Sequence, residues 1–171
     1  IEIKEYPDTT SSGIFDLLML YPANTITTHT FEIVDRSKAM SSVSKQQKRL
    51  RSGEDKAFSQ QAELVQLQDD IMSGNVALGQ SSTTFFISAE NIEEIKKKSN
   101  ELMTELQRLG IVATFSDTTL PSAFFSQLPG NLAYRPRQSL ITSHNFADFA
   151  DFHGFYSCLL YTSDAADERS S

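Results

Sequence analysis

The sequence predicts an α+β domain: a ferredoxin-like split β-α-β sandwich with a long helical insertion, followed by a short helical connector. Segments with strand-like alternation and segments with a helical period follow one another as β-α-β, a helical excursion, then β-α-β. The chain has 171 residues, of which 39% are hydrophobic and 22% charged, as is typical of one globular domain. Two such units side by side predict an antiparallel sheet that helices cover on one face.

The first β-α-β unit is predicted within residues 1–34. Ile1–Tyr6 alternates apolar and charged residues, which is typical of a half-buried strand. Ile14–Tyr21 is predicted to be a helix that Pro22 ends. Thr25–Val34 is rich in β-branched residues and is predicted to be a strand. It carries His29, which we expect to be an ordinary strand residue and not a metal ligand.

The helical insertion is predicted to contain two helices. Ser37–Arg51 is a polar helix whose basic side chains could contact anionic lipid or phosphate, although a solvated helix face is the simpler interpretation. Ser52–Asp55 can cap a second helix, which Gly74 ends. The apolar face of the second helix is predicted to contain Phe58, Ala62, Val65 and Met72, widened by Leu64, Leu67 and Ile71.

The second β-α-β unit begins with the predicted strand Ser82–Ala89. Asn91 and Glu94 then form a capping box for a helix that Gly110 ends. The apolar stripe of this helix contains Ile92, Ile95, Leu102, Leu106 and Leu109. Ile111–Ser116 is the next predicted strand, and Pro121 opens a short helix.

We find no pattern for catalysis, a cofactor or a metal in this chain. No GxxxxGK[ST] loop or dinucleotide fingerprint is present, and the net charge of −7 disfavours nucleic-acid binding. Ser143, His144 and Asp148 are the residue types of a hydrolase triad, but no G-x-S-x-G elbow holds the serine. The spacing of His144 and His153 fits no zinc site, and Cys158 is the sole cysteine.

The segment Leu128–Phe155 has the most unusual composition. After a turn at Pro129–Gly130, Arg135 and Arg137 flank a rigid proline, and such arginines suit bidentate contacts with carboxylate or phosphate. Two interpretations remain open: contact with a neighbouring domain, or a salt bridge within this chain. Asn145, with Asp148, is predicted to cap a helix that carries Phe146, Phe149 and Phe152.

The order FFSQLPGN, YRPR and TSHNFADFADFHGF, with SGEDKAFSQQAELVQLQDDIMSGNVALG upstream, resembles the central domain of the CagE/TrbE/VirB family. These are the large ATPases of bacterial type IV secretion and conjugation systems, and the resemblance covers roughly Ile1 to Tyr156. It implies an accessory domain at 1–128 and a connector at 129–156 that leads to an absent RecA-like motor domain. ATP and Mg²⁺ would bind there, so we expect this chain to be a non-catalytic fragment.

The resemblance also implies the surroundings of the protein. The whole protein would power channel or pilus assembly and substrate transfer, on the cytoplasmic side of the bacterial inner membrane and peripheral to it. Its partners would be the motor domain, further subunits of a homo-oligomer and other channel components, without direct nucleic-acid binding. Arg135, Arg137 and Asn145 would lie at the contact between domains.

Two further expectations concern the tail and an alternative function. Residues 157–171, which contain CLLYTSDAADE, resemble the translated read-through of a sequencing adapter in metagenomic data, so we expect them to be non-native. The alternative function is a stand-alone ferredoxin-like module that binds protein or RNA. Phe85 and Phe86 could stack on bases, but the acidic chain lacks the basic Gly-Phe motif of such RNA readers.

Overall fold

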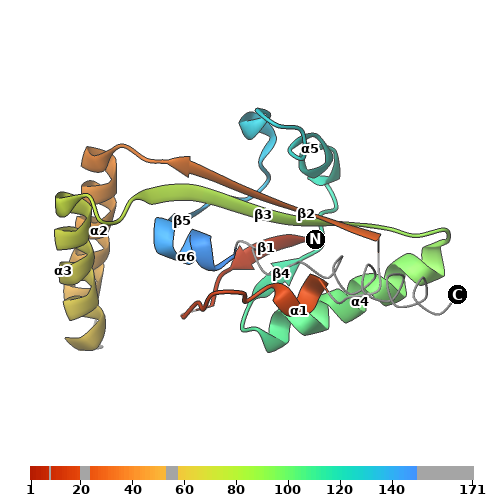
Figure 1. Cartoon of the computed structure of the whole chain (residues 1–171), viewed down its shortest axis with the longest axis horizontal. Coiled ribbons are helices and arrows are strands. Elements are labelled where there is room, and N and C mark those ends of the chain that lie inside the picture. The colour runs from red at the N-terminus through yellow and green to blue at the C-terminus, as the bar shows by residue number, and fades with distance from the viewer. Residues whose placement is uncertain (8, 20–23, 53–57, 150–171) are drawn as a thin grey trace, which may run out of the picture.

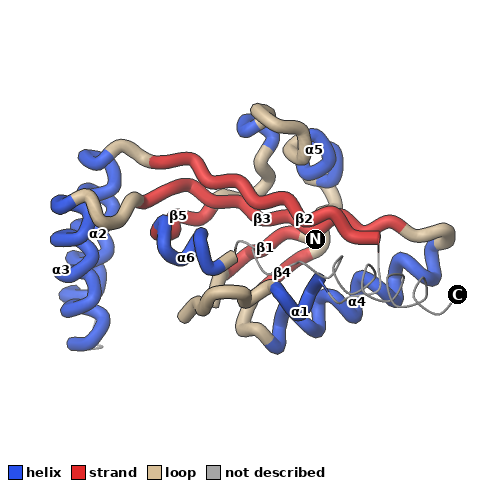
Figure 2. The backbone as a smooth tube through the Cα atoms, in the orientation of Figure 1, coloured by secondary structure: helices blue, strands red, loops and turns tan. Residues whose placement is uncertain are grey.

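The computed structural model describes residues 1–7, 9–19, 24–52 and 58–149. The strands in this part of the chain are β1 Glu2–Glu5, β2 Asn24–Ile33, β3 Leu78–Ser88, β4 Val112–Thr114 and β5 Ser139–Thr142. The helices are α1 Asp16–Met19, α2 Arg36–Ser52, α3 Phe58–Ser73, α4 Ile92–Arg108, α5 Leu120–Phe125 and α6 Ser143–Asp148, with the 3₁₀ turn η1 Leu132–Tyr134. Figures 1 and 2 show their arrangement.

The sheet confirms the predicted α+β fold. Its order is β2-β3-β1-β4, so the two β-α-β units interleave, and the α2–α3 hairpin is inserted between β2 and β3. β3 is the central element. One of its edges pairs with β2 from Ser88 to Gly79. The other edge is shared by β1, at Glu2↔Thr84, and by β5, from Leu78 to Ser81.

The main core lies on the face of the sheet that α1, α4 and α6 cover (Figure 1). It consists of Ile3, Phe15, Phe85, Leu102, Leu106, Ile111 and Phe149. The Phe15 ring is central, because it lies 5.3 Å from the Phe149 ring and 5.4 Å from the His29 ring. α1 begins at Asp16, later than predicted, because the chain turns at Gly13 with a φ of 75°.

α4 confirms its predicted cap but not its whole predicted stripe. The Asn91 side chain accepts a hydrogen bond of 2.8 Å from the backbone N–H of Glu94. Leu102 and Leu106 are buried, whereas Ile92 and Ile95 are exposed. The prediction for those two isoleucines was wrong. The buried core on α4 begins only at Leu102, so no described element packs over the first turns of the helix.

The prediction of helices on a single face was wrong. β3 is apolar on both faces, since Phe85 lies in the main core while Phe86 packs on Phe124 of α5, with ring centroids 5.8 Å apart. Figure 1 shows α5 on the side of the sheet opposite α1, α4 and α6. A second apolar strand face needs its own cover, and the segment between β4 and β5 provides it.

The α2–α3 hairpin has a small core of its own at one end of the sheet (Figure 2). Ala39, Val43, Ile71 and Leu78 are buried there, with Met40, Leu64 and Leu67 packed against them. The predicted face of α3 is confirmed at Leu64, Leu67 and Ile71. It was wrong at Val65 and Met72, which are exposed. The helix buries only the narrower stripe that faces α2. The predicted cap at Ser52–Asp55 and the predicted helix end at Pro22 lie largely outside the described residues.

β3 begins at Leu78, earlier than the predicted Ser82, and β5 was not predicted. At Gly79 the ring of Phe31 lies where a Cβ would be, and Phe31 stacks on Phe146 of α6 at 4.7 Å. Gly79 therefore leaves room for the Phe31 ring of the neighbouring strand to lie against the backbone of β3. A sequence pattern does not reveal such a contact. β5 is short, and its pairing partner β3 lies far away in the sequence.

Candidate functional site

Arg135 lies directly after η1 and is bound within the domain. Its Nε donates to the carbonyl of Leu132 at 2.8 Å, one terminal nitrogen donates to the carbonyl of Gln80 at 3.3 Å, and the other pairs with Glu32. The Arg135 side chain is only 5% exposed. Of the two open interpretations, the salt bridge within the chain is therefore present, and it fastens the segment before β5 to the sheet.

Arg137 makes the second arginine contact but stays partly open to solvent. Its Nε donates to the carboxylate of Glu2 at 2.9 Å, and its side chain is 48% exposed whereas that of Glu2 is 2% exposed. The Thr119 hydroxyl donates to the other Glu2 oxygen. Burial opposes the charge of Glu2, but the hydroxyls of Ser116 and Thr119 and the guanidinium of Arg137 hold its pKa below the ordinary value.

We expect Glu2→Gln to lower the free energy of unfolding by about 1–2 kcal/mol at neutral pH, because the buried charge-assisted bonds are lost. The lowered pKa means that the ionised carboxylate stabilises the fold above the ordinary glutamate pKa. This contribution is lost as the pH falls through the lowered value of the folded state. Urea unfolding at several pH values measures it. Glu5→Gln is the matched control, since Glu5 is exposed; equal losses in both variants would contradict the expectation.

Asn145 lies on α6, where the predicted cap was wrong by three residues. The N-cap is Thr142, whose hydroxyl accepts a 3.0 Å hydrogen bond from the backbone N–H of Asn145. The Asn145 amide donates to Thr10 at 2.8 Å, and the Thr10 hydroxyl donates to Asp148. Asn145, the third residue of α6, therefore links α6 to the loop before α1. Phe152, predicted on the same helix, lies outside the described residues.

These contacts separate the predicted site residues. Glu32 and Glu2, which bind Arg135 and Arg137, share the sheet face of Phe86 by their register, and Phe86 packs on α5. Asn145 belongs to α6, which lies on the opposite side of the sheet (Figure 1). Two of the triad residue types have structural hydrogen bonds: Ser143 accepts one from the backbone N–H of Ala77, and Asp148 accepts one from the Thr10 hydroxyl. In the described part of the chain, no group of three or more His, Cys, Asp or Glu side chains could hold a metal ion.

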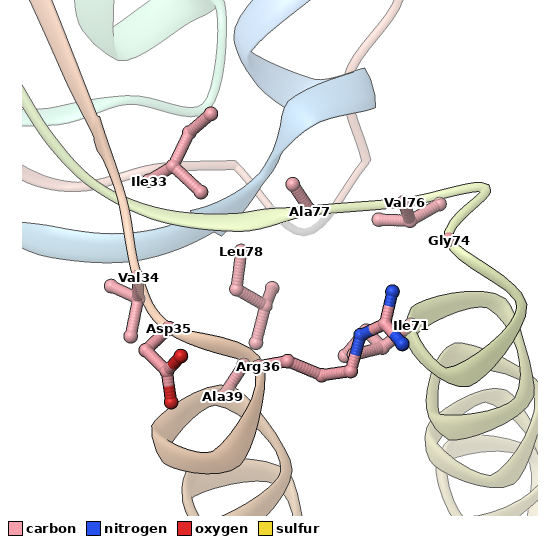
Figure 3. A pocket seen from close by; sticks show the side chains of 10 residues that line it. All are labelled: Ile33, Val34, Asp35, Arg36, Ala39, Ile71, Gly74, Val76, Ala77 and Leu78. Atoms are coloured by element: carbon pink, nitrogen blue, oxygen red, sulfur yellow. The ribbon is translucent and has the colours of Figure 1, made fainter.

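The sequence did not indicate a cavity at the base of the α2–α3 hairpin (Figure 3). Its volume is about 470 Å³, and it lies between the end of β2, the start of α2, the end of α3 and the start of β3. Its lining is mainly apolar, and Asp35 and Arg36 are its charged members. The Asp35 carboxylate accepts a hydrogen bond of 3.0 Å from the backbone N–H of Ser37, in the first turn of α2. It is therefore engaged at the start of that helix. The lining holds no nucleophile or general base in a catalytic arrangement.

Comparison with known proteins gives a decisive match. The family described as "CagE, TrbE, VirB family, component of type IV transporter system" matches residues 1–137. The chain belongs to this family. The CagE/TrbE/VirB match covers every described element from β1 to η1, which includes both arginine contacts.

Individual relatives of this CagE/TrbE/VirB chain are also type IV secretion system proteins, in agreement with the family match. It is 32% identical over 156 residues to the type IV secretion system protein PtlC homolog of Bordetella bronchiseptica, which covers 91% of this chain and 19% of the relative. It is 34% identical over 154 residues to the type IV secretion system protein virB4 of Bartonella henselae, with 89% and 19% covered. The chain thus spans about a fifth of the length of these relatives. Among the described residues, no helix has the length and apolar character needed to cross a bilayer.

Proposed function

We propose that this chain is a non-catalytic accessory unit of a type IV secretion ATPase. The supporting observation is the pairing of two coverages: 91% of this chain aligns with only 19% of the PtlC homolog. The chain contains no GxxxxGK[ST] loop. ATP and Mg²⁺ would therefore bind in the remaining part of the parent protein. Hydrolysis of ATP there would power channel or pilus assembly and substrate transfer.

The accessory unit would work through contacts. Its partners would be the motor domain, neighbouring subunits and other channel components, on the cytoplasmic side of the inner membrane. Arg137 supports a contact between domains best among the predicted residues, since about half of its side chain remains exposed after its bond to Glu2. Arg135 supports such a contact only indirectly, because its guanidinium is already bound on all three nitrogens.

The alternative of an RNA-binding module finds less support. Stacking on bases requires aromatic rings that are open on the sheet surface. Phe85 is buried in the main core, and Phe86 is packed against Phe124. Phe85 is therefore closed to a base, and Phe124 covers part of the half-buried Phe86.

Calorimetric titration with ATP and Mg²⁺ tests the proposal directly. We expect no binding to this 171-residue chain and micromolar binding to the complete protein from the same gene. Saturable micromolar binding to the short chain would refute the non-catalytic assignment. A complete gene without a phosphate-binding loop would refute the ATPase parentage.

A second prediction concerns Arg137 in the complete protein. Arg137→Gln should lower the ATPase rate or change the oligomer size, because a contact between domains loses its cation. Arg108→Gln is the matched control: Arg108 is exposed and also pairs with one carboxylate, that of Glu105. Thermal melts of both short-chain variants show how much of any effect is lost stability. Equal ATPase rates and oligomer sizes for the two variants would contradict the role of Arg137.

A further inference from the structure

The segment Thr118–Tyr134, which we name the α5–η1 cap, combines two unusual properties. It contains no Asp, Glu, Lys, Arg or His, although the whole chain carries a net charge of −7. Its large apolar side chains are also open to solvent, each between 38% and 54% exposed. These are Leu120, Phe124, Phe125, Leu128, Leu132 and Tyr134. Single exposed apolar residues are common, but a group of this size indicates a binding surface.

The aromatic rings of the cap form one continuous patch with Phe86 on β3. Leu128 adjoins this patch, since its backbone N–H donates to the carbonyl of Phe125 at 3.2 Å. The ring of Phe86 on β3 lies 5.8 Å from that of Phe124, which lies 5.5 Å from Phe125, and Phe125 lies 5.9 Å from Tyr134. Ile26 pairs with Phe86 in the sheet register, shares its face and is 54% exposed. The patch therefore runs from the edge strand β2 across α5 to η1.

The cap is held firmly on the sheet at both ends. At its start, Thr119 donates to the buried carboxylate of Glu2, which Arg137 also binds. Just beyond its end, Arg135 binds Glu32 and the carbonyl of Gln80. The two arginines just beyond the cap are thus paired with Glu32 and Glu2. A surface that is already in place loses little conformational entropy on binding.

We propose that the α5–η1 cap is the contact surface between two copies of this chain, related by a two-fold axis. The proposal deepens the proposed function by naming the surface for one of its partners, a neighbouring subunit. Its test on the isolated chain is separate from the ATP titration, so either can fail without the other. Charge selects this surface for a contact between copies: two copies with a net charge of −7 repel each other, and the uncharged cap is where they can meet with the least repulsion. An isologous contact must be complementary to itself, which an uncharged apolar patch satisfies.

The available area and composition fit the same partner. The exposed parts of the apolar side chains amount to roughly 600 Å² per copy, taking about 200 Å² for a whole aromatic residue. A pair of copies would then bury on the order of 1,200 Å² of apolar surface, above the roughly 1,000 Å² expected of a specific interface. Aromatic enrichment and missing charge are typical of the centre of an interface. An anionic membrane would instead attract Lys and Arg, which the cap lacks.

Sedimentation equilibrium of the 171-residue chain tests the proposal over about 1–500 µM. We expect a reversible dimer that becomes tighter as salt rises from about 0.05 to 0.5 M, because salt screens the repulsion between acidic copies. Leu128→Glu should raise the dimer dissociation constant at least about tenfold by placing a charge in the patch. Met72→Glu is the matched control, since Met72 on α3 is 59% exposed and Leu128 is 54% exposed. It should change the constant less than about twofold.

Three outcomes would overturn the proposal. One is a chain that stays monomeric over the whole concentration range. Another is a dimer that both substitutions weaken equally, which would place the contact elsewhere. The third is flotation of the wild-type chain, but not of Leu128→Glu, with phosphatidylcholine–phosphatidylglycerol vesicles, which would make the cap a lipid-binding surface. Circular dichroism melts of both variants verify that each is folded at the temperature of measurement.

Discussion

Leu106→Ala should lower the free energy of unfolding by about 2–5 kcal/mol, a large loss for a single substitution. Leu106 is 0% exposed and lies in the core cluster where α4 packs on the sheet. Truncation removes buried methyl groups and leaves a cavity that close-packed neighbours fill only partly. Urea or thermal unfolding followed by circular dichroism measures the change.

Ile92→Ala provides the matched control on the same helix. Ile92 is 72% exposed, so its truncation should change the free energy of unfolding by less than about 0.5 kcal/mol. Both positions belong to the stripe that the sequence predicts, and the two variants separate the part of the stripe that is buried from the part that is not. Equal losses at both positions would show that the first turn of α4 is covered after all.

Acidification from pH 7 to pH 4 should lower the free energy of unfolding by up to about 3 kcal/mol through His29 alone. Burial lowers the pKa of His29 from 6.5 to about 4. Its Nδ1 lies 3.0 Å from the hydroxyl of Thr83, its ring stacks on Phe15, and its buried Nε2 has no hydrogen-bond partner among the described residues. Between these two pKa values the unfolded chain binds a proton that the folded chain does not, so stability falls as the pH falls.

Urea unfolding of wild type and His29→Gln at intervals from pH 7.5 to pH 4 would measure this effect. Glutamine keeps a polar group near Thr83 but does not titrate, so the variant should show a flatter curve between about pH 6.5 and 4.5. Below that window Glu2 also loses its stabilising charge, because its folded-state pKa is lowered. Parallel curves for the two proteins would contradict the role of His29.

Local signals of the sequence predicted much of the secondary structure. The β-branched run of β2, the two helices of the insertion, the Asn91 cap of α4 and Pro121 at the start of α5 were all confirmed. Each depends on the residue itself and on neighbours within a few positions, through backbone preference, side-chain period or capping. The same locality explains the errors at Ile92, Val65 and Met72. An apolar period shows which side chains share a face, but not how much of that face another element covers.

The candidate site depended far more on tertiary structure. The sequence singled out Arg135, Arg137 and Asn145, but their partners Glu32, Glu2 and Thr10 are more than 100 residues away. The sequence likewise did not predict the exposed aromatic cap, because phenylalanines such as Phe124 and Phe125 are usually core residues. Folding placed them over the second face of the sheet, where no further described element covers their outer side.

The sequence by itself determined the order of helices and strands, the acidic character of the chain and its resemblance to the CagE/TrbE/VirB family, because these depend on local pattern and composition. Tertiary structure alone decided the addition of β5 to β3, the burial of Glu2 with Arg137, the separation of Asn145 from the two arginines, and the exposure of the α5–η1 cap. The physical reason is the same in each case. Strand pairing, ion pairing and burial are properties of two segments together, and no pattern within one segment specifies its distant partner.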